Sequence, residues 1–271
     1  MQTLYQSPRD PDFFQNPFVF YKKIRNAGKI VWWKEYNMVV TPDYNLVNNI
    51  LRDKTFVREP PSGFFSNVPD HLKPFYENEA RSMLEREPPY HTKLKALTSP
   101  FFTNRKLKQL KKEMEFSCNN LLEKISAPEF DLISSFAQKF PVTIIARMLG
   151  VPESMAPQLV RWSNDMVAMY QARRDETIER KAVEAINEFS EYIKDLLKQK
   201  KLSSSDDLIS YLSQTNTAKD PINEEEIIST IILLLNAGHE ATVHTISNGV
   251  KTILESSFKF VDLLKDPKRL V

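Results

Sequence analysis

The chain has 271 residues, of which 41% are hydrophobic and 27% charged, a composition typical of globular proteins. The formal net charge of +2, without interleaved basic and aromatic residues, argues against a nucleic-acid partner, and five scattered glycines exclude glycine-rich phosphate loops. The amino terminus has no signal-like run, and the most apolar stretch, 227–237, is far shorter than the ~20 residues that cross a bilayer, so we expect a cytoplasmic protein without a membrane anchor.

The amino-terminal part, residues 13–41, is predicted to contain a short helix and a β-hairpin. Apolar side chains recur at helical spacing before Gly28, at Phe14, Phe18, Tyr21 and Ile24. Two runs of β-forming residues, 30–33 and 38–40, predict a hairpin, which should pack on further strands or helices because an isolated pair of strands is marginal. Pro42 then marks the start of a helix over residues 43–51.

Residues 59–87 form an irregular stretch with prolines at 60, 61, 69 and 74. A loop of this length inside a compact domain is uncommon and often functional. Helical periodicity resumes near Tyr90 and continues near 104–125, 134–149, 155–170, 175–200, 205–213 and 223–257. Because no repeat, low-complexity tract or linker interrupts the chain, we expect one mainly α domain over residues 1–271, with its helical body over 43–271.

The helix over residues 223–257 is predicted to be the central one. Asn223 and Glu226 have the spacing of a capping box, and Pro221 stands just outside it. The residues that follow leave almost no polar face: Ile227, Ile228, Ile231, Ile232, Leu233, Leu234 and Leu235. A helix that is apolar on all sides is buried in the middle of a sizeable protein.

Farther along this helix, helical geometry places Ala237, Gly238 and Ala241 in one patch without bulky side chains, with Glu240 and Thr242 at its edges. Such a patch lets a broad, flat group approach the backbone, and a carboxylate and a hydroxyl beside it can move protons. The alternative interpretation is close helix packing at Gly238 together with a core glutamate whose hydrogen bonds are satisfied.

Metal and disulfide chemistry is not supported by the residues present. A zinc site of the H-E-x-x-H type needs histidines four residues apart, whereas His239 and His244 are five apart, about 140° around the helix. The single cysteine, Cys118, excludes an internal disulfide and a cysteine-rich metal site.

In this helix and in four other blocks, the sequence resembles the cytochromes P-450, the heme-thiolate monooxygenases, and in particular their soluble bacterial members. The stretch LLLNAGHEAT at 233–242 is similar to the family's long oxygen-binding helix. EPPYHTKLK at 87–95, leading into SPFFT at 99–103, is similar to the segment that contacts the heme propionates. Three weaker blocks follow in the family's order: NPF at 16–18 with Tyr21, LGVPE at 149–153 and DDLI at 206–209.

The resemblance implies an incomplete cytochrome P-450 fold, mainly α with a small β-hairpin element, and heme b as the cofactor. It assigns His91 and Lys95, which are four residues apart on one helix face, to the heme propionates. It assigns Ala237 and Gly238 to the surface that faces oxygen, and Glu240 to the acid that helps deliver protons there. The alternative for His91 and Lys95 is an ordinary solvated first turn.

Two features depart from the family pattern. The family usually has a threonine directly after the acid, whereas this chain has Ala241 followed by Thr242; if Thr242 does not substitute, we expect more reduced oxygen to escape as peroxide. The family's iron is held by a cysteine near the carboxyl end. The 271 residues of this sequence contain no E-x-x-R motif. The single cysteine, Cys118, lies in a helical segment, where it is expected to be a small core residue. We therefore expect this chain alone to be inactive.

The resemblance also implies a substrate site, O2 as co-substrate and a ferredoxin- or flavodoxin-type electron donor. The candidate lining residues, of kinds also common in plain cores, are Phe64, Phe65, Met83, Leu84, Met166, Leu233, Leu234 and Ala237. Their apolar character favours a lipophilic substrate. Basic residues between 93 and 112 fit donor docking, or are simply a solvated helix face.

The predicted function is therefore the O2-dependent oxidation of a lipophilic small molecule, for which this chain supplies the amino-terminal portion. The alternative from another class is a non-catalytic remnant, or a helical module that needs a partner chain to complete its core. An unrelated helical binding protein is a third interpretation, which requires the five ordered blocks to be coincidental.

Overall fold

The structure is a computed structural model that describes residues 1–59, 63, 68–202, 205–214, 222–257, 261 and 265. The chain divides into two compact units. Unit 1 comprises Met1–Pro61 and Tyr170–Asp175, and unit 2 comprises Ser62–Met169 and Glu176–Val271. All candidate site residues belong to unit 2, and the expectation of a single domain over residues 1–271 stays a prediction.

Unit 1 contains three short strands: β1 (Gln2–Leu4), β2 (Val31–Trp33) and β3 (Met38–Val40). β2 and β3 are antiparallel, with Val31 opposite Val40, which confirms the predicted hairpin. Its turn closes through a hydrogen bond from the Asn37 amide to the Lys34 carbonyl (3.0 Å). β1 pairs in parallel with β2 and was not predicted, because three residues are too short to show strand periodicity.

The single short helix predicted before Gly28 is in fact two helices, α1 (Pro11–Gln15) and α2 (Phe18–Ala27). The prediction was wrong at its centre because Pro17 has no backbone N–H to continue a helical hydrogen-bond ladder. α2 buries Phe20 and Ile24 in a small core with the β2 strand. The other apolar side chains that carried the prediction are exposed: Phe14, Phe18 and Tyr21.

The third helix of unit 1, α3 (Tyr44–Arg52), confirms the helix predicted over residues 43–51. Its N-cap is Asp43, whose Oδ1 accepts a hydrogen bond from the Leu46 amide at 2.9 Å. Pro42 therefore stands outside the helix rather than in its first turn.

Unit 2 is built from helices, in this order: η1 (Asp70–Leu72), α4 (Lys73–Glu79), α5 (Tyr90–Thr98), η2 (Ser99–Phe102), α6 (Asn104–Glu123), η3 (Ile133–Ala137), α7 (Lys139–Leu149), η4 (Glu153–Met155), α8 (Ala156–Val167), α9 (Glu176–Lys200), α10 (Leu208–Gln214) and α11 (Glu224–Glu255). A 3-10 turn after α8, η5 (Ala168–Tyr170), begins in unit 2 and ends at Tyr170, which belongs to unit 1. These helices confirm the mainly α class and the helical segments predicted after Tyr90.

The stretch predicted to be irregular, residues 59–87, is partly helical because it contains η1 and α4. Pro74 lies in the first turn of α4, where a missing N–H costs nothing, so this proline starts a helix instead of breaking one. Phe64 and Phe65, which were expected to line the substrate site, lie outside the described residues.

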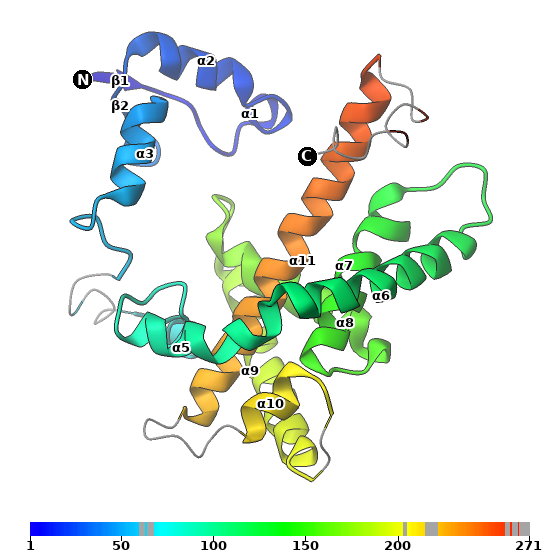
Figure 1. Cartoon of the computed structure of the whole chain (residues 1–271). Helices are drawn as coiled ribbons and strands as arrows, with labels where there is room; N and C mark the ends of the chain where they lie inside the picture. The colour runs from blue at the N-terminus through cyan, green and yellow to red at the C-terminus, as the bar shows by residue number, and fades with distance from the viewer. Residues whose placement is uncertain are drawn as a thin grey trace. The chain divides into compact units, whose positions relative to one another are not determined.

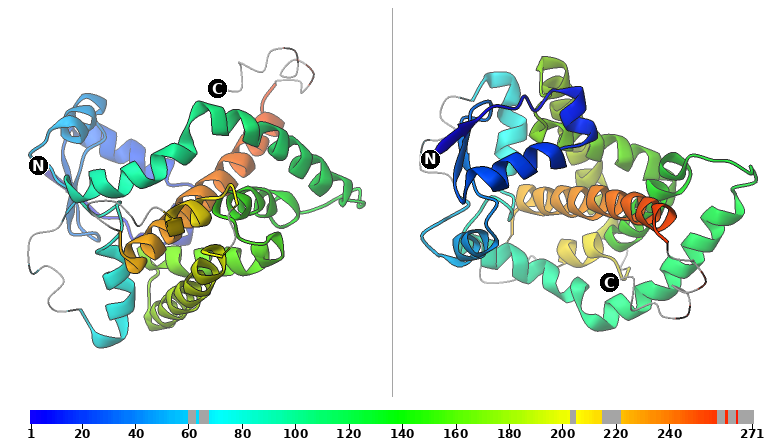
Figure 2. Two further views of the ribbon diagram at one scale, coloured as in Figure 1. Left: turned by 60° about the horizontal axis from the view of Figure 1, so that its bottom comes forward. Right: turned by 90° about the horizontal axis from the view of Figure 1, so that it is seen from above.

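α11 runs through unit 2 as a single long helix (Figure 1 and Figure 2) and packs on α7, α8, α9 and η3. The capping box is confirmed: the Asn223 side chain accepts from the Glu226 amide (2.8 Å), and the Glu226 carboxylate accepts from the Asn223 amide (2.9 Å). Five of the apolar residues predicted to be buried are buried: Ile227, Ile228, Ile231, Ile232 and Leu235. No helix in the described part of the chain is long and apolar enough to span a membrane.

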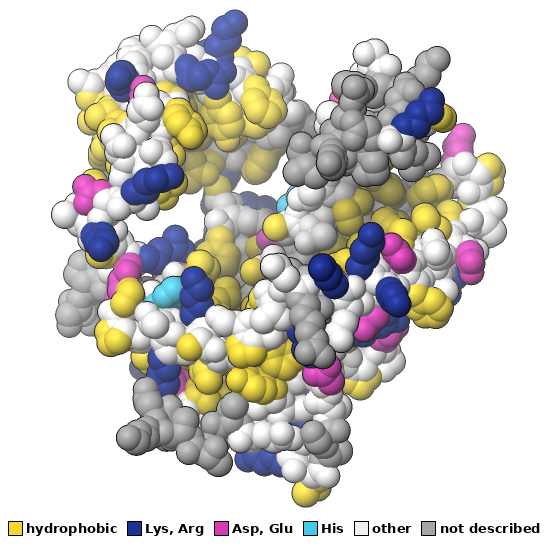
Figure 3. All heavy atoms as spheres, in the orientation of Figure 1, with side chains coloured by type: hydrophobic (Ala, Val, Ile, Leu, Met, Phe, Trp, Pro, Cys, Tyr) yellow, Lys and Arg dark blue, Asp and Glu magenta, His cyan; other side chains and the backbone are white. Residues whose placement is uncertain are grey.

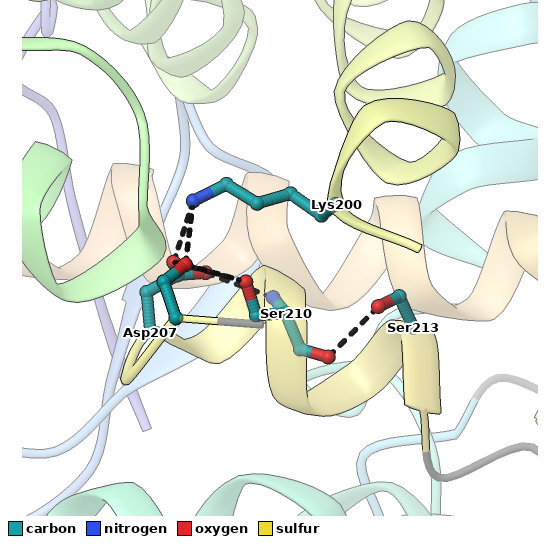
Figure 4. A network of polar contacts seen from close by, with 5 residues as sticks. Lys200, Asp207, Ser210 and Ser213 are labelled. Carbon is teal, nitrogen blue, oxygen red and sulfur yellow. Dashed lines mark hydrogen bonds and ion pairs between the residues drawn. The ribbon is translucent and has the colours of Figure 1, made fainter. Parts of the chain in front are cut away.

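Two of the weaker motif blocks, 149–153 and 206–209, meet in space. Gly150 ends α7 with a φ of 86°, and a Cβ atom built there would lie 2.2 Å from Cγ of Asp207, so only glycine leaves room for this carboxylate. Asp207 accepts from the Ser210 amide (2.8 Å) and from Lys200 Nζ (2.6 Å), as Figure 4 shows. Burial alone would raise the pKa of Asp207, but Lys200, Ser205 and Ser210 together lower it.

Candidate functional site

α11 presents an open face over residues 234–241. Ala237 and Ala241, one helical turn apart, are both exposed, and Leu234 lies half-buried one turn before them. The helix is buried on its other side, through Leu235 and His239. Because the side chains on the open face are small, the helix backbone there is accessible to a flat ligand.

Gly238 takes part in a different contact. A Cβ atom built on Gly238 would lie 2.3 Å from Cδ1 of Ile145 on α7, far closer than two carbon atoms pack. The missing side chain lets α7 and α11 approach each other, and this packing offsets the cost of roughly 1 kcal/mol for glycine inside a helix. The structure thus has the close helix packing that was the alternative interpretation, and the assignment of Gly238 to the oxygen-facing surface stays a prediction.

Glu240 and Thr242 flank the open face. The Glu240 side chain is 37% exposed rather than part of the core, and its Oε1 lies 3.7 Å from Nε2 of His244. The Thr242 hydroxyl donates to the Gly238 carbonyl at 2.9 Å. Since this bond uses the hydroxyl proton, the lone pairs of Oγ1 remain free to accept from a ligand or from water. The pair combines a carboxylate in contact with solvent and a hydroxyl acceptor beside the open face.

His239 is the most enclosed polar side chain of this region. It is 1% exposed, and neither ring nitrogen has a hydrogen-bond partner of good geometry among the described residues, although the backbone of Gln138 lies close enough to act on the ring. Burial lowers the pKa of His239, and it outweighs the nearby backbone of Gln138 and the Glu240 carboxylate, which act in the opposite direction. The ring is therefore neutral at pH 7 and behaves as part of the packing behind the open face.

His91 and Lys95 lie on one face of α5, where His91 is half-buried and Lys95 is exposed. Neither side chain makes an ion pair or a hydrogen bond with another described residue. Lys93, between them in sequence, instead points its Nζ to within 3.6 Å of the Glu226 carboxylate. Two donors without carboxylate partners fit a ligand that carries two carboxylates of its own, as heme b does in its propionates.

Glu226 joins α5 to the first turn of α11. This carboxylate is 4% exposed, contacts Lys93 and accepts a hydrogen bond from the Tyr90 hydroxyl. Burial and the bond to Glu226 raise the pKa of Tyr90, so that the tyrosine stays protonated and continues to donate. The junction fixes α5 beside the helix whose open face includes Ala237, about 16 Å farther along the helix axis.

Sequence reasoning found only part of this arrangement. It identified Glu226 as a helix cap, but not as the partner of Tyr90 and Lys93. It also missed Ile145, because nothing in the periodicity of α7 indicates which of its side chains meets Gly238. The one available signal was the capping glutamate itself, since a buried N3 carboxylate requires further partners.

The candidate substrate-lining residues have different environments. Leu233 and Leu234 are half-buried on α11, near its open face. Met83 is half-buried against the main core, whereas Leu84 is 47% exposed. Met166 is 1% exposed and belongs to the core, so it does not line an open site. The structure thus brings Leu233 and Leu234 together with Ala237 on one helix, and the roles of Met83 and Leu84 stay predictions.

Cys118 is a free, half-buried thiol within α6. This position agrees with the small packing residue expected on a helix. Within the described ranges, no group of three or more His, Cys, Asp or Glu side chains could hold a metal ion.

Comparison with known proteins places these features in a family. The family model described as Cytochrome P450 matches residues 12–256. Cytochrome P450 CYP107DY1 of Priestia megaterium is 35% identical over 64% of this chain and 42% of its own length. The biotin biosynthesis cytochrome P450 of Bacillus subtilis is 30% identical over 98% of this chain and 67% of its own length.

The fold is also similar to solved structures. P450BioI, crystallised in complex with hexadec-9Z-enoic acid ligated acyl carrier protein, has a TM-score of 0.85 and 27% identity, covering 95% of this chain and 67% of that one. The chain spans 42%, 53% and 62% of the length of three curated relatives. The family match includes both α5 and the open face of α11, and it extends over most of the sequence. This chain therefore belongs to the cytochrome P450 family.

Proposed function

We propose that this chain forms the oxygen-side wall and the propionate-binding helix of a cytochrome P450 monooxygenase that oxidises a lipophilic small molecule with O2. The observation that carries the proposal is the open, small-residue face of α11 at Ala237 and Ala241, with the Glu240 carboxylate beside it. A plain core helix has no need of such a face.

His91 and Lys95 hold the cofactor in this proposal. Their unpaired side chains donate to the two propionates of heme b, while Ala237 and Ala241 leave room for the flat macrocycle. Heme, when bound, supplies the activation of O2 for insertion of one oxygen atom into a C–H or C=C bond. The Glu226 junction keeps the propionate-binding helix α5 in a fixed place relative to α11.

In this proposal Glu240 transfers protons to the open face and Thr242 accepts a hydrogen bond there. The half-exposed Glu240 carboxylate takes a proton from solvent and releases it toward the open face. Thr242 accepts a hydrogen bond at Oγ1, because its own proton is donated to the Gly238 carbonyl. Ala241 stands where the resemblance to the family leads us to expect a threonine, so Thr242 is the hydroxyl available next to the acid.

The substrate is a lipophilic molecule that lies against Leu233, Leu234, Met83 and Leu84. The acyl chain bound with the neighbouring P450BioI structure supports this class. The electron donor is of the ferredoxin or flavodoxin type and docks on basic residues near α5 and α6. Because this surface interaction is electrostatic, we expect it to weaken with salt.

A second candidate is a helical module completed by a partner chain. Exposed apolar side chains on α6 and on the segment that follows it favour this alternative: Phe116, Leu122 and Phe130. Light scattering distinguishes the two candidates, because a module that lacks a partner is expected to self-associate, whereas the propionate-binding role does not require association.

Titration of the 271-residue chain with ferric heme tests the proposal. We expect the Soret band and tryptophan fluorescence to report binding, and the His91→Ala/Lys95→Ala double variant to bind about tenfold more weakly, the equivalent of one charged hydrogen bond. The control is Lys108→Ala/Lys111→Ala on α6, which should leave the affinity unchanged. Equal affinity for the wild-type chain and the α5 double variant would overturn the role of His91 and Lys95.

A further inference from the structure

A pocket lies beside α7, and it is distinct from the contact between Ile145 and α11. It has a volume of about 490 Å³ and is formed by α6, η3, α7 and the first turns of α8. Ile145 is not among its lining residues, and neither is any residue of α5 or α11. In the region of α6, Figure 3 shows hydrophobic side chains next to both basic and acidic ones. The pocket is therefore separate from the open face of α11.

Most of the exposed lining of this pocket is apolar, although it contains polar side chains as well. Its apolar lining includes Leu121 of α6, Val142 of α7, and Pro157 and Val160 of α8. Val142 is 1% exposed, so it also belongs to the main core. A mostly apolar cavity within the ~300–1,000 Å³ range suits a small molecule.

Two of the charged groups that line the pocket have no ion-pair partner among the described residues. Lys124 at the end of α6 and Lys139 at the start of α7 line it, and neither makes an ion pair with another described residue. Arg147, a third cation in the lining, differs because it is paired with Glu153. Two unpaired lysines beside an apolar cavity give it a net attraction for an anion.

Ser117, which also lines the pocket, adds an independent observation. Its side chain is 3% exposed, yet its hydroxyl has no hydrogen-bond partner among the described residues. A buried hydroxyl without a partner is uncommon in folded proteins, because it costs about 1–3 kcal/mol. Ser117 and Lys124 lie two turns apart on α6, about 10 Å along the helix axis. The pocket thus has a cationic end and a hydroxyl at a defined distance from it.

We propose that this pocket binds a small amphipathic monocarboxylate that carries a second oxygen near its far end. The carboxylate pairs with Lys124 and Lys139, the aliphatic chain lies against Leu121 and Val142, and the distal oxygen exchanges a hydrogen bond with Ser117. No residue of the open α11 face or of the α5 face takes part, so the proposal stands independently of the proposed oxidation.

Calorimetric titration of the full chain with three probes tests this inference: 8-hydroxyoctanoate, octanoate and octane-1,8-diol. We expect 8-hydroxyoctanoate to bind more tightly than octanoate, and octanoate more tightly than the diol. Lys124→Glu/Lys139→Glu should weaken both carboxylates at least tenfold. Ser117→Val should remove the preference for 8-hydroxyoctanoate over octanoate without abolishing binding of octanoate.

Matched variants keep the test specific. Lys201→Glu carries the same charge change on an exposed lysine outside the pocket and should have no effect. Ala241→Trp, on the open face of α11, should also leave the affinities unchanged. Equal binding of the carboxylates by the double lysine variant and by the wild type overturns the proposal, as does binding that is lost in Ala241→Trp. Circular dichroism establishes that each variant is folded.

Discussion

The two parts of α11, called here its first half (residues before Asn236) and its second half (residues from Asn236 on), differ in what surrounds them. In the first half, eight residues are buried: Glu226, Ile227, Ile228, Ser229, Thr230, Ile231, Ile232 and Leu235. In the second half only His239 and Val243 are buried, although the helix continues unbroken to Glu255. The same element therefore serves as a core helix over its first turns and as a wall with one open face farther on.

The polar groups of the two halves differ in the same way. In the first half each buried hydroxyl donates to a carbonyl: Ser229 to Asn78 (2.9 Å) and Thr230 to Glu226 (2.8 Å). In the second half His239 lacks partners and Glu240 is half-exposed. Of these two groups, His239 belongs to the packing behind the open face, whereas the Glu240 carboxylate is accessible to solvent beside it.

Truncation of a core residue in the first half should have the largest effect on stability. Ile231 is fully buried, so Ile231→Ala should lower the free energy of unfolding by about 2–5 kcal/mol, from lost burial and the cavity left behind. Leu254→Ala, at a residue that is 68% exposed near the end of the helix, should change it by less than about 0.5 kcal/mol. Urea unfolding measures both. Equal decreases in the free energy of unfolding for the two variants would mean that the two halves of α11 do not differ in burial.

A pair of glycines sharpens the comparison within the second half. Gly238→Ala should destabilise by about 1 kcal/mol net, because overpacking against Ile145 outweighs the better helix propensity of alanine. Gly249→Ala should instead stabilise by about 0.5–1 kcal/mol, since nothing lies within 4 Å of a Cβ atom there. If both substitutions change the urea midpoint in the same direction, the α7–α11 contact is not as close as described.

His239 predicts a pH dependence that belongs to the second half. Burial lowers its pKa, so the unfolded chain binds the proton more readily than the folded one. The contribution of His239 to the free energy of unfolding should therefore be fully present above about pH 6.5, the ordinary pKa of histidine. It should decrease as the pH falls below that value. Urea midpoints at pH 7.5 and 5.5 measure this decrease.

The histidine variants provide the control for that measurement. His239→Leu should reduce the loss of stability between the two pH values. His244→Leu, at a side chain that is 67% exposed, should change it much less, because His244 is the smallest of the groups that act on the pKa of His239. A pH dependence that persists unaltered in His239→Leu would assign the effect to other groups. Asp207, whose pKa is lowered, loses its contribution only at more acidic pH, below about 4.

The first half of α11 could be predicted from the sequence, because its signals are local. The capping box located the start at Asn223, and the continuous apolar run indicated burial. The contacts that position the candidate site were not predictable, because they join distant segments: Glu226 meets Tyr90, and Gly238 meets Ile145. Residues such as His91 and Lys95 were found through the resemblance to a family, since two donors on a helix face are ordinary without it.

The smallest effect on stability is expected on α5, at the residues assigned to the cofactor. Lys95→Ala should change the free energy of unfolding by less than about 0.5 kcal/mol, because the side chain is exposed and unpaired. Lys93→Met should cost about 1–3 kcal/mol, because it leaves the buried Glu226 carboxylate without its cation. If Lys95→Ala weakens heme binding while stability stays constant, the outer face of α5 is a binding surface. If the free energy of unfolding falls together with the heme affinity, Lys95 contributes to the fold. Lys95 and Lys93 would then not differ in role.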